Sequence, residues 1–262
     1  MPCSIEPKPT SPKSSDPALA IRCAAVTKRF HFYEHRTTSL REAFIRVARR
    51  KPLDIRRARF TLHDVSFDIA PGEALGIIGP NGSGKSTLLR LLAGIYAPTE
   101  GRIEVRGRTA AVIELGAGFH PELTGAENVD LYGAVMGLSP RELAERFDEI
   151  VAFAGLAEFI DTPIKYYSSG MQARLAFAVT VCVRPDILLI DEALAVGDQW
   201  FRERCLAHLT QFHGAGGTLV IVSHDMDTLS RLCGRAVWLE RGSVRMAGPM
   251  ADVRRAYEVS SP

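Results

Sequence analysis

Continuous runs of apolar residues, separated by amphipathic stretches, mark the second half of this chain. Residues 187–190 and 218–222 are two such runs, and residues 74–78 form a third nearer the N-terminus. Strands that are covered on both faces have this composition, so the runs predict buried parallel strands. The stretch 200–212 lies between two of the runs and suits a crossover helix. Together these features predict an α/β fold built around a parallel sheet.

Weaker patterns predict further elements around this sheet. Strands are also expected at 21–26, 60–69, 102–107, 110–115, 236–240 and 243–247. The period becomes helical after Thr124, and helices are expected at 127–136, 140–154, 172–183 and 252–259. Residues 1–19 are rich in Pro and Ser and have few large apolar groups, which predicts a disordered tail.

Residues 79–86 follow the predicted strand 74–78 and precede a Leu- and Ala-rich stretch that suits a helix. They match the phosphate-binding pattern G-x-x-x-x-G-K-[ST], which requires this strand–loop–helix context. Glycines let the backbone N–H groups turn toward phosphate oxygens, and the helix N-terminus adds its positive end. Lys85 would reach the β- and γ-phosphates of ATP, and the Ser86 hydroxyl would bind Mg²⁺. The expected nucleotide contacts are Gly79, Pro80, Asn81, Gly82, Ser83, Gly84, Lys85, Ser86 and Thr87.

Two carboxylates and a histidine stand at the ends of two predicted strands. Asp191 and Glu192 follow the run 187–190, where an acid beside a phosphate loop can hold Mg²⁺ and a second can act as general base. Asp191 is therefore the expected metal ligand and Glu192 the expected catalytic base. His224 follows the strand 218–222 at the edge where ligands bind in parallel sheets, so it could contact the γ-phosphate. A surface histidine without a role is the alternative.

Residues 167–174 read Tyr-Ser-Ser-Gly-Met-Gln-Ala-Arg and stand just ahead of the apolar helix predicted at 172–183. Small residues at a helix start leave N–H groups free and direct the positive helix end outward, which forms an anion site. Ser168, Ser169 and Gly170 are therefore candidate phosphate contacts. An ordinary serine N-cap is the alternative.

Composition limits the class of protein and its partners. The hydrophobic content of 46% and charged content of 24% describe a globular protein, and the net charge of +2 gives no reason to expect nucleic acid. No run of about 20 apolar residues is present, and the N-terminus lacks the apolar core of a secretory signal. The five cysteines are widely spaced, which predicts reduced thiols without a metal site.

One segment, residues 36–59, is locally basic. Leu40, Ala43, Phe44 and Val47 have helical spacing, and Ser39 is a plausible N-cap. The segment is either a solvated surface helix or a basic amphipathic helix at a membrane surface or a membrane partner. Its basic residues are Arg36, Arg41, Arg46, Arg49, Arg50, Lys51, Arg56, Arg57 and Arg59.

In their order along the chain, these motifs resemble the ATP-binding subunit of ABC transporters. Residues 79–86 resemble Walker A, 167–171 the signature motif and 187–192 Walker B, while Asp198 and His224 match the D-loop acid and the switch histidine. The resemblance implies a P-loop NTPase cassette with a RecA-like core, an antiparallel β subdomain and a helical subdomain at about 120–183. It implies one nucleotide-binding domain over 20–262, with an insertion at 31–59. It also implies a homodimer in which each ATP lies between the Walker motifs of one subunit and the signature residues of the other.

Departures from the family pattern narrow the resemblance. The signature has Tyr167, Ser169 and Met171 where Leu, Gly and Gln are usual, and Glu114 stands near the place of the Q-loop glutamine. Together with residues 114–125 and 191–198, these features resemble the ATPases of exporters of O-antigen, capsule or teichoic acid. The aromatic residue that stacks on adenine in the family would be Phe30 or Tyr33.

The resemblance implies the following function. We expect ATP hydrolysis with Mg²⁺ that drives an ABC-2-type transmembrane permease exporting a polysaccharide or lipid-linked glycan. The subunit would lie at the cytoplasmic face of the bacterial inner membrane. Some O-antigen relatives carry a glycan-binding domain after the cassette, and none is expected here because the sequence ends at Pro262. An exporter of lipids or drugs and a soluble ATPase that acts on nucleic acid are the alternatives.

Overall fold

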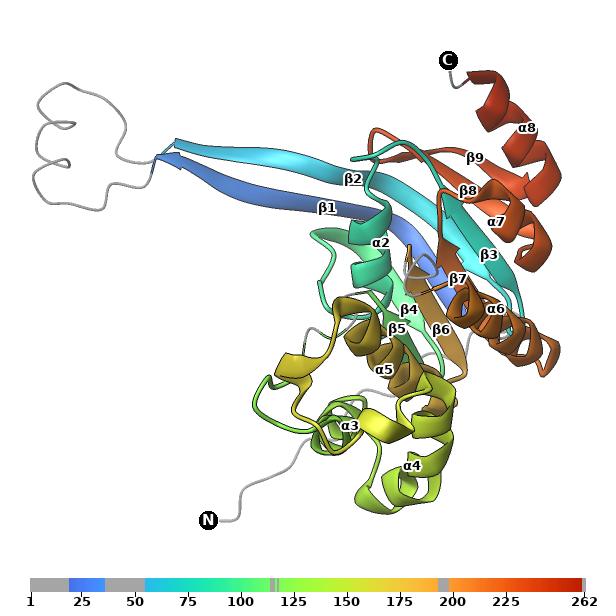
Figure 1. Ribbon diagram of the computed structural model, residues 1–262. Helices are drawn as coiled ribbons and strands as arrows, with labels where there is room; N and C mark the ends of the chain where they lie inside the picture. Colours follow the sequence, from blue (N-terminus) through green and yellow to red (C-terminus); the bar gives the residue numbers. More distant parts are fainter. Residues whose placement is uncertain (1–18, 36–54, 114–115, 117, 193–197, 261–262) are drawn as a thin grey trace, which may run out of the picture.

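The computed structural model describes residues 19–35, 55–113, 116, 118–192 and 198–260, and for residues 31–35 and 55–60 it describes the backbone alone. Two sheets and a set of helices make up these residues (Figure 1). The predicted tail, apart from Leu19, and the predicted basic helix after Ser39 lie outside the described residues.

The larger sheet has six strands in the order β5-β6-β7-β3-β8-β9. All neighbouring pairs are parallel except β8 and β9, which form the predicted hairpin at one edge. Every residue of β3 and β7 is buried, which confirms that the apolar runs are strands covered on both faces. The strands are β3 (Ala74–Ile78), β5 (Thr109–Val112), β6 (Ile187–Asp191), β7 (Thr218–Val222), β8 (Arg235–Glu240) and β9 (Ser243–Pro249).

The smaller sheet is antiparallel, in the order β2-β1-β4, with β1 (Ile21–His35), β2 (Ile55–Ile69) and β4 (Glu100–Val105). The first two strands are longer than the sequence predicts, because they pair from Ile21 opposite Ile69 out to His35 opposite Ile55. Residues 31–35 and 55–59, which were expected to belong to the insertion, are therefore strand residues. After Val26 the sequence of β1 no longer alternates between apolar and polar residues. Its continuation as a strand is visible only from its pairing with β2. Figure 1 shows this hairpin projecting from the body as a two-stranded arm.

The strands predicted at 102–107 and 110–115 are both present, but they lie in different sheets. Residue Arg22 of β1 pairs with Glu104 of β4, whereas Ala110 of β5 pairs with Leu188 of β6. The turn between β4 and β5 therefore carries the chain from the antiparallel sheet to the parallel one.

Helix α2 (Lys85–Leu92) packs between the two sheets, with Leu88, Leu89, Leu91 and Leu92 buried among their side chains. Buried apolar side chains of both sheets belong to the same core cluster as those of the helix, so this short helix is covered on both sides. The phosphate loop precedes its N-terminus, so the loop is attached to a buried helix.

The predicted helical region lies on the other side of the larger sheet (Figure 1). Capping boxes begin α3 and α4, at Thr124 with Glu127 and at Ser139 with Glu142, and Gly155 ends α4 with a left-handed φ of 64°. A cluster of Phe153, Phe177 and Phe201 joins α4 and α5 to α6, with ring centroids 5.8–6.1 Å apart. The elements are α3 (Gly125–Val135), α4 (Pro140–Ala154), α5 (Ser169–Cys182), and two 3₁₀ turns at Ala157–Phe159 and Ile164–Tyr166.

Three helices complete the described chain: α6 (Gln199–Gly214), α7 (Met226–Leu232) and α8 (Met250–Ser260). The sequence predicts α6 and α8 but not α7, which is only 7 residues long and offers less than two full helical periods. None of the helices in the described residues has the length and apolarity needed to cross a membrane.

Four cysteines, Cys23, Cys182, Cys205 and Cys233, are buried as free thiols, while Cys3 lies outside the described residues. Burial raises the pKa of each of these four thiols to about 12. Within the described residues no group of His, Cys, Asp and Glu is arranged to hold a metal ion by itself.

Candidate functional site

The predicted site residues meet at the carboxyl edge of the larger sheet. Strand β7 lies between β3 and β6, so the segments that follow these three strands are neighbours. The phosphate loop follows β3, Asp191 ends β6 and is followed by Glu192, and His224 follows β7. The topology therefore brings together residues that are more than a hundred positions apart in the chain.

Two glycines of the phosphate loop have close neighbours that exclude a side chain. Gly79 has a φ of 147°, and a Cβ atom there would run into the carbonyl oxygen of Leu239 in β8. Gly84 has a φ of 106°, and a Cβ atom there would lie 2.6 Å from the Leu62 side chain and 2.7 Å from the Thr61 carbonyl oxygen. Since L side chains rarely adopt these conformations, the loop can keep this shape only with glycine at both positions.

The loop leaves donors free for an anion. Gly84 is the N-cap of α2 and provides no side chain to cap it, so the first N–H groups of the helix remain available. The hydroxyl oxygen of Ser83 is buried and has no hydrogen-bond partner among the described residues. A phosphate group would satisfy both sets of donors.

Lys85 lies inside the loop and is only 6% exposed. Its ammonium group donates to the carbonyl oxygens of Gly79 (2.9 Å) and Pro80 (3.2 Å). Burial lowers the pKa of this lysine, and the nearby carboxylates of Glu192 and Asp191 oppose the shift. The lysine is thus held in the loop by two carbonyl groups that a phosphate could replace.

Asp191 and Ser86 form the candidate metal site. Burial is the main cause that raises the pKa of Asp191, while a hydrogen bond with Ser86 opposes the rise. The other carboxylate oxygen of Asp191, Oδ1, is buried without a hydrogen-bond partner among the described residues. An unpaired buried carboxylate oxygen next to a hydroxyl suits Mg²⁺, which prefers oxygen ligands.

Glu192 and His224 are in direct contact. The distance between Glu192 Oε1 and His224 Nε2 is 2.7 Å, and each side chain is about half exposed. Glu192 has a left-handed φ of 47°, which is unusual for a residue other than glycine and is often found at functional sites. Its N–H group donates to Val222 O (2.9 Å), which fixes the strained residue to the end of β7.

Sequence reasoning did not identify the residues that shape the loop around His224. The Ser223 hydroxyl accepts from Asp225 N (3.0 Å), and Asp225 caps α7. The signal was an Asp directly before a short helix, a common N-cap arrangement, but α7 is too short to be predicted from its pattern. Glu192, His224 and Asp225 line a cavity of about 220 Å³ together with residues of α6 and α7.

Ser168 is the N-cap of α5, as in the alternative interpretation of this segment as an ordinary serine N-cap. Ser168 accepts from Met171 N (3.2 Å), and Ser169 and Gly170 form the first turn. Tyr167 is buried below them and donates from its hydroxyl to Phe159 O (2.6 Å). No hydrogen bond joins this turn to the phosphate loop within the described part of the chain.

The remaining predicted residues have more limited descriptions. Asp198 is the N-cap of α6 and accepts from Phe201 N (2.9 Å). Phe30 lies edge-on to Tyr96, with ring centroids 5.5 Å apart, and the Lys28 ammonium lies 5.1 Å from the Phe30 centroid. Glu114 and the side chain of Tyr33 lie outside the described residues.

Comparison with known proteins identifies the family. The sequence pattern described as "ABC transporter" matches residues 62–195. The O-antigen export system ATP-binding protein RfbB of Klebsiella pneumoniae is 42% identical over 91% of this chain and 97% of its own length. The teichoic acids export ATP-binding protein TagH of Bacillus cereus is 42% identical. That match covers 88% of this chain but only 41% of the length of TagH.

A solved structure has the same fold. The dimeric post-hydrolysis state of the ATP-binding cassette MJ0796, bound to ADP and Pi, has a TM-score of 0.70 at 25% identity. The match covers 88% of this chain and 98% of that one. The chain therefore belongs to the ABC transporter family and is one of its nucleotide-binding ATPases.

Proposed function

We propose that this chain is the ATP-hydrolysing subunit of a transporter that exports a cell-surface polysaccharide or a lipid-linked glycan. The observation that carries the proposal is the 42% identity with an O-antigen export ATP-binding protein over 97% of that protein's length. A relative of equal identity is named for the export of teichoic acids, so the exported substrate is proposed as a glycan in general and not as one particular polymer.

In the proposed reaction, the phosphate loop binds ATP and Lys85 exchanges its two carbonyl partners for the β- and γ-phosphates. Glu192 lies at the carboxyl edge of the sheet, where it would accept a proton from the attacking water. His224 would hold Glu192 through their 2.7 Å contact and would itself contact the γ-phosphate. Phe30 or Tyr33 would stack on adenine, and Glu114 would take the place of the Q-loop glutamine.

Ser86 and the unpaired Oδ1 of Asp191 would hold Mg²⁺ at this site. The bound ion would neutralise negative charge on the phosphate oxygens. Burial raises the pKa of Asp191 because it removes water from around the charged carboxylate. A cation bound at this position would offset that loss of solvation.

The proposed active form is a homodimer. Ser168, Ser169 and Gly170 begin α5 without a hydrogen bond to the phosphate loop of their own subunit among the described residues, and the N–H groups of this helix start are suited to a phosphate held by a partner. Asp198 would lie between the subunits. The dimer would dock on an ABC-2-type transmembrane permease at the cytoplasmic face of the bacterial inner membrane.

The test is a deletion of the gene in its own bacterium, followed by analysis of the surface glycans. We expect a glycan to disappear from the surface and to return with the wild-type gene but not with Glu192→Gln at equal expression. A strain whose surface glycans are unchanged, but whose lipid or drug export is lost, would contradict the proposal.

A further inference from the structure

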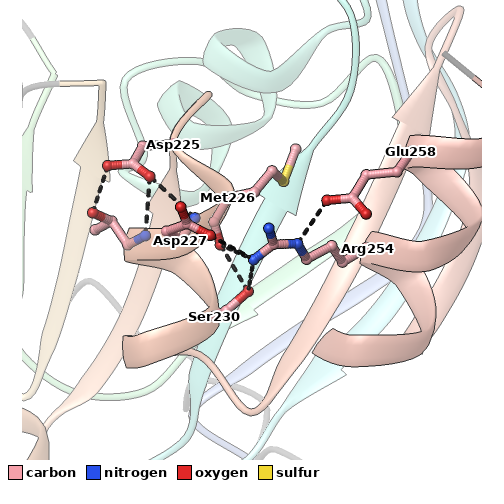
Figure 2. A network of polar contacts seen from close by, with 7 residues as sticks. Asp225, Met226, Asp227, Ser230, Arg254 and Glu258 are labelled. Atoms are coloured by element: carbon pink, nitrogen blue, oxygen red, sulfur yellow. Dashed lines mark hydrogen bonds and ion pairs between the residues drawn. The ribbon is translucent and has the colours of Figure 1, made fainter.

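Helix α8 is joined to α7 by one arginine (Figure 2). Arg254 Nη1 donates to Asp227 Oδ1 (2.8 Å), Ser230 Oγ (3.0 Å) and Met226 O (3.4 Å), all on α7. Its Nε donates to Glu258 (2.7 Å), one turn further along α8. The guanidinium group therefore reaches from α8 to two groups in the first turn of α7, on Met226 and Asp227, and to Ser230 in the next turn.

Helix α8 is itself fixed to the parallel sheet. Met250 and Val253 are buried, and the Tyr257 ring lies edge-on to Trp238 of β8 with centroids 5.3 Å apart. The contact with α7 is thus made from a helix whose own position is set by the sheet.

The other end of this contact is the loop that carries His224. Asp225 Oδ1 accepts from Asp227 N (3.0 Å) and Thr228 N (3.1 Å), and Oδ2 accepts from Thr228 Oγ1 (2.7 Å). Ser223 and Asp225 are also hydrogen-bonded to each other, on either side of His224. Because these bonds tie the residues on both sides of His224 to one another and to the start of α7, a displacement of this turn would move the imidazole relative to Glu192.

Helix α7 depends on its surroundings for its position. A helix of 7 residues has little stability of its own, so packing and side-chain contacts must hold it. Leu229 and Leu232 anchor its second half in the core, whereas Met226 and Asp227 begin it near the surface. In the first turn, Arg254 of α8 supplies hydrogen bonds to Met226 and Asp227, while Arg202 and Leu206 of α6 line the cavity beside Thr228.

We propose that Arg254 is a positioning residue for the hydrolysis step: it holds the first turn of α7 and, through Asp225, keeps His224 in contact with Glu192. The inference rests on the role of His224 given under the proposed function. It adds that a residue in the first half of α8, remote from the nucleotide site in sequence, influences the rate of hydrolysis.

The test measures ATPase kinetics of purified Arg254→Met. Misplacement of a catalytic group should lower kcat by roughly tenfold, with KM for ATP and the binding of ATP unchanged. Arg254→Lys should lie between this variant and the wild type, since an ammonium group can satisfy fewer of the partners at once. Arg255→Met is the matched control, because Arg255 is on the same helix, is exposed and has no polar contact with the described residues.

A double-mutant cycle separates positioning from a general effect on folding. If Arg254 acts through His224, Arg254→Met should cause no further loss of kcat in a His224→Ala background. The Asp227 side chain is 84% exposed, so its ion pair with Arg254 contributes little to stability and Tm should be close to that of the Arg255→Met control.

Three results would overturn the inference. The first is that Arg254→Met has the same kcat as the control while His224→Ala has a lower one. In that case His224 would keep its proposed role and Arg254 would have none. Another is losses that multiply in the double variant. The third is a His224→Ala variant with wild-type kcat, which would also remove His224 from the proposed function.

Discussion

At the end of β6, Glu192 has a left-handed backbone conformation that costs on the order of 1–3 kcal/mol for a residue other than glycine. Its side chain is held by His224, and its N–H group is held by Val222. Removing the charge while keeping the shape separates the chemical role of this residue from its structural one.

Glu192→Gln should therefore bind ATP with unchanged affinity and hydrolyse it at least about 10²-fold more slowly, because an amide is a poor general base. The variant should accumulate as an ATP-bound dimer, which size-exclusion chromatography with ATP would detect. Glu104→Gln, a surface carboxylate of β4, is the control and should have normal turnover. Near-normal turnover of Glu192→Gln would show that another group accepts the proton.

Among the elements, the hairpin of β1 and β2 is the most distinctive. Each strand has 15 residues, about 50 Å of extended chain, and only their inner parts belong to the core of the smaller sheet. The two strands lead into residues 36–54, which the structure does not describe. This basic segment is expected to form either a solvated surface helix or a contact with the membrane or the permease.

Changing Arg41, Arg46, Arg49 and Arg50 together to Gln should lower export and lipid-stimulated ATP turnover. Anionic headgroups contribute about 1 kcal/mol for each nearby basic residue. ATPase activity of the isolated subunit should hardly change, because these residues lie outside the motifs.

The matched control removes the same charge from the body of the protein, at the exposed Arg102, Arg141, Arg241 and Arg255. If this control lowers export equally, net charge rather than the segment is responsible. A collapse of basal hydrolysis in the first variant would mean that the segment supports the cassette fold.

At the scale of the whole molecule, one subunit holds only half of each proposed composite site. The phosphate loop and the start of α5 belong to the same chain, but no hydrogen bond joins these two segments within the described residues. A phosphate between two subunits would use both.

Mixing Lys85→Ala with Ser168→Arg subunits should therefore restore activity that neither variant has alone, since each mixed dimer keeps one intact site. ATP hydrolysis by the mixture is the measurement, with mixed dimers shown by differently tagged subunits. Two Lys85→Ala preparations mixed with each other provide the inactive control. Mixed dimers without any recovered activity would show that each subunit works alone.

Much of this arrangement follows from local sequence signals. The phosphate loop, β6 with Asp191, and the helix beginning at Pro140 each have an unambiguous pattern, cap or apolar run, and all are present. Pairing partners have no such local signal, so the extension of β1 to His35 and the separation of β4 from β5 were not predicted. The contact of α8 with the start of α7 was also not predicted, because it joins residues about 30 positions apart.

The burial of the four described cysteines has a practical consequence for following the motions of this protein. With a pKa of about 12, their thiols have almost no thiolate near neutral pH, so alkylating and spin-labelling reagents should react with them very slowly in the folded state. After Cys3→Ser, single cysteines at the exposed Val135 and Val259 could be labelled without altering the core. The distance between such labels would report how the helical region and α8 move during the ATP cycle.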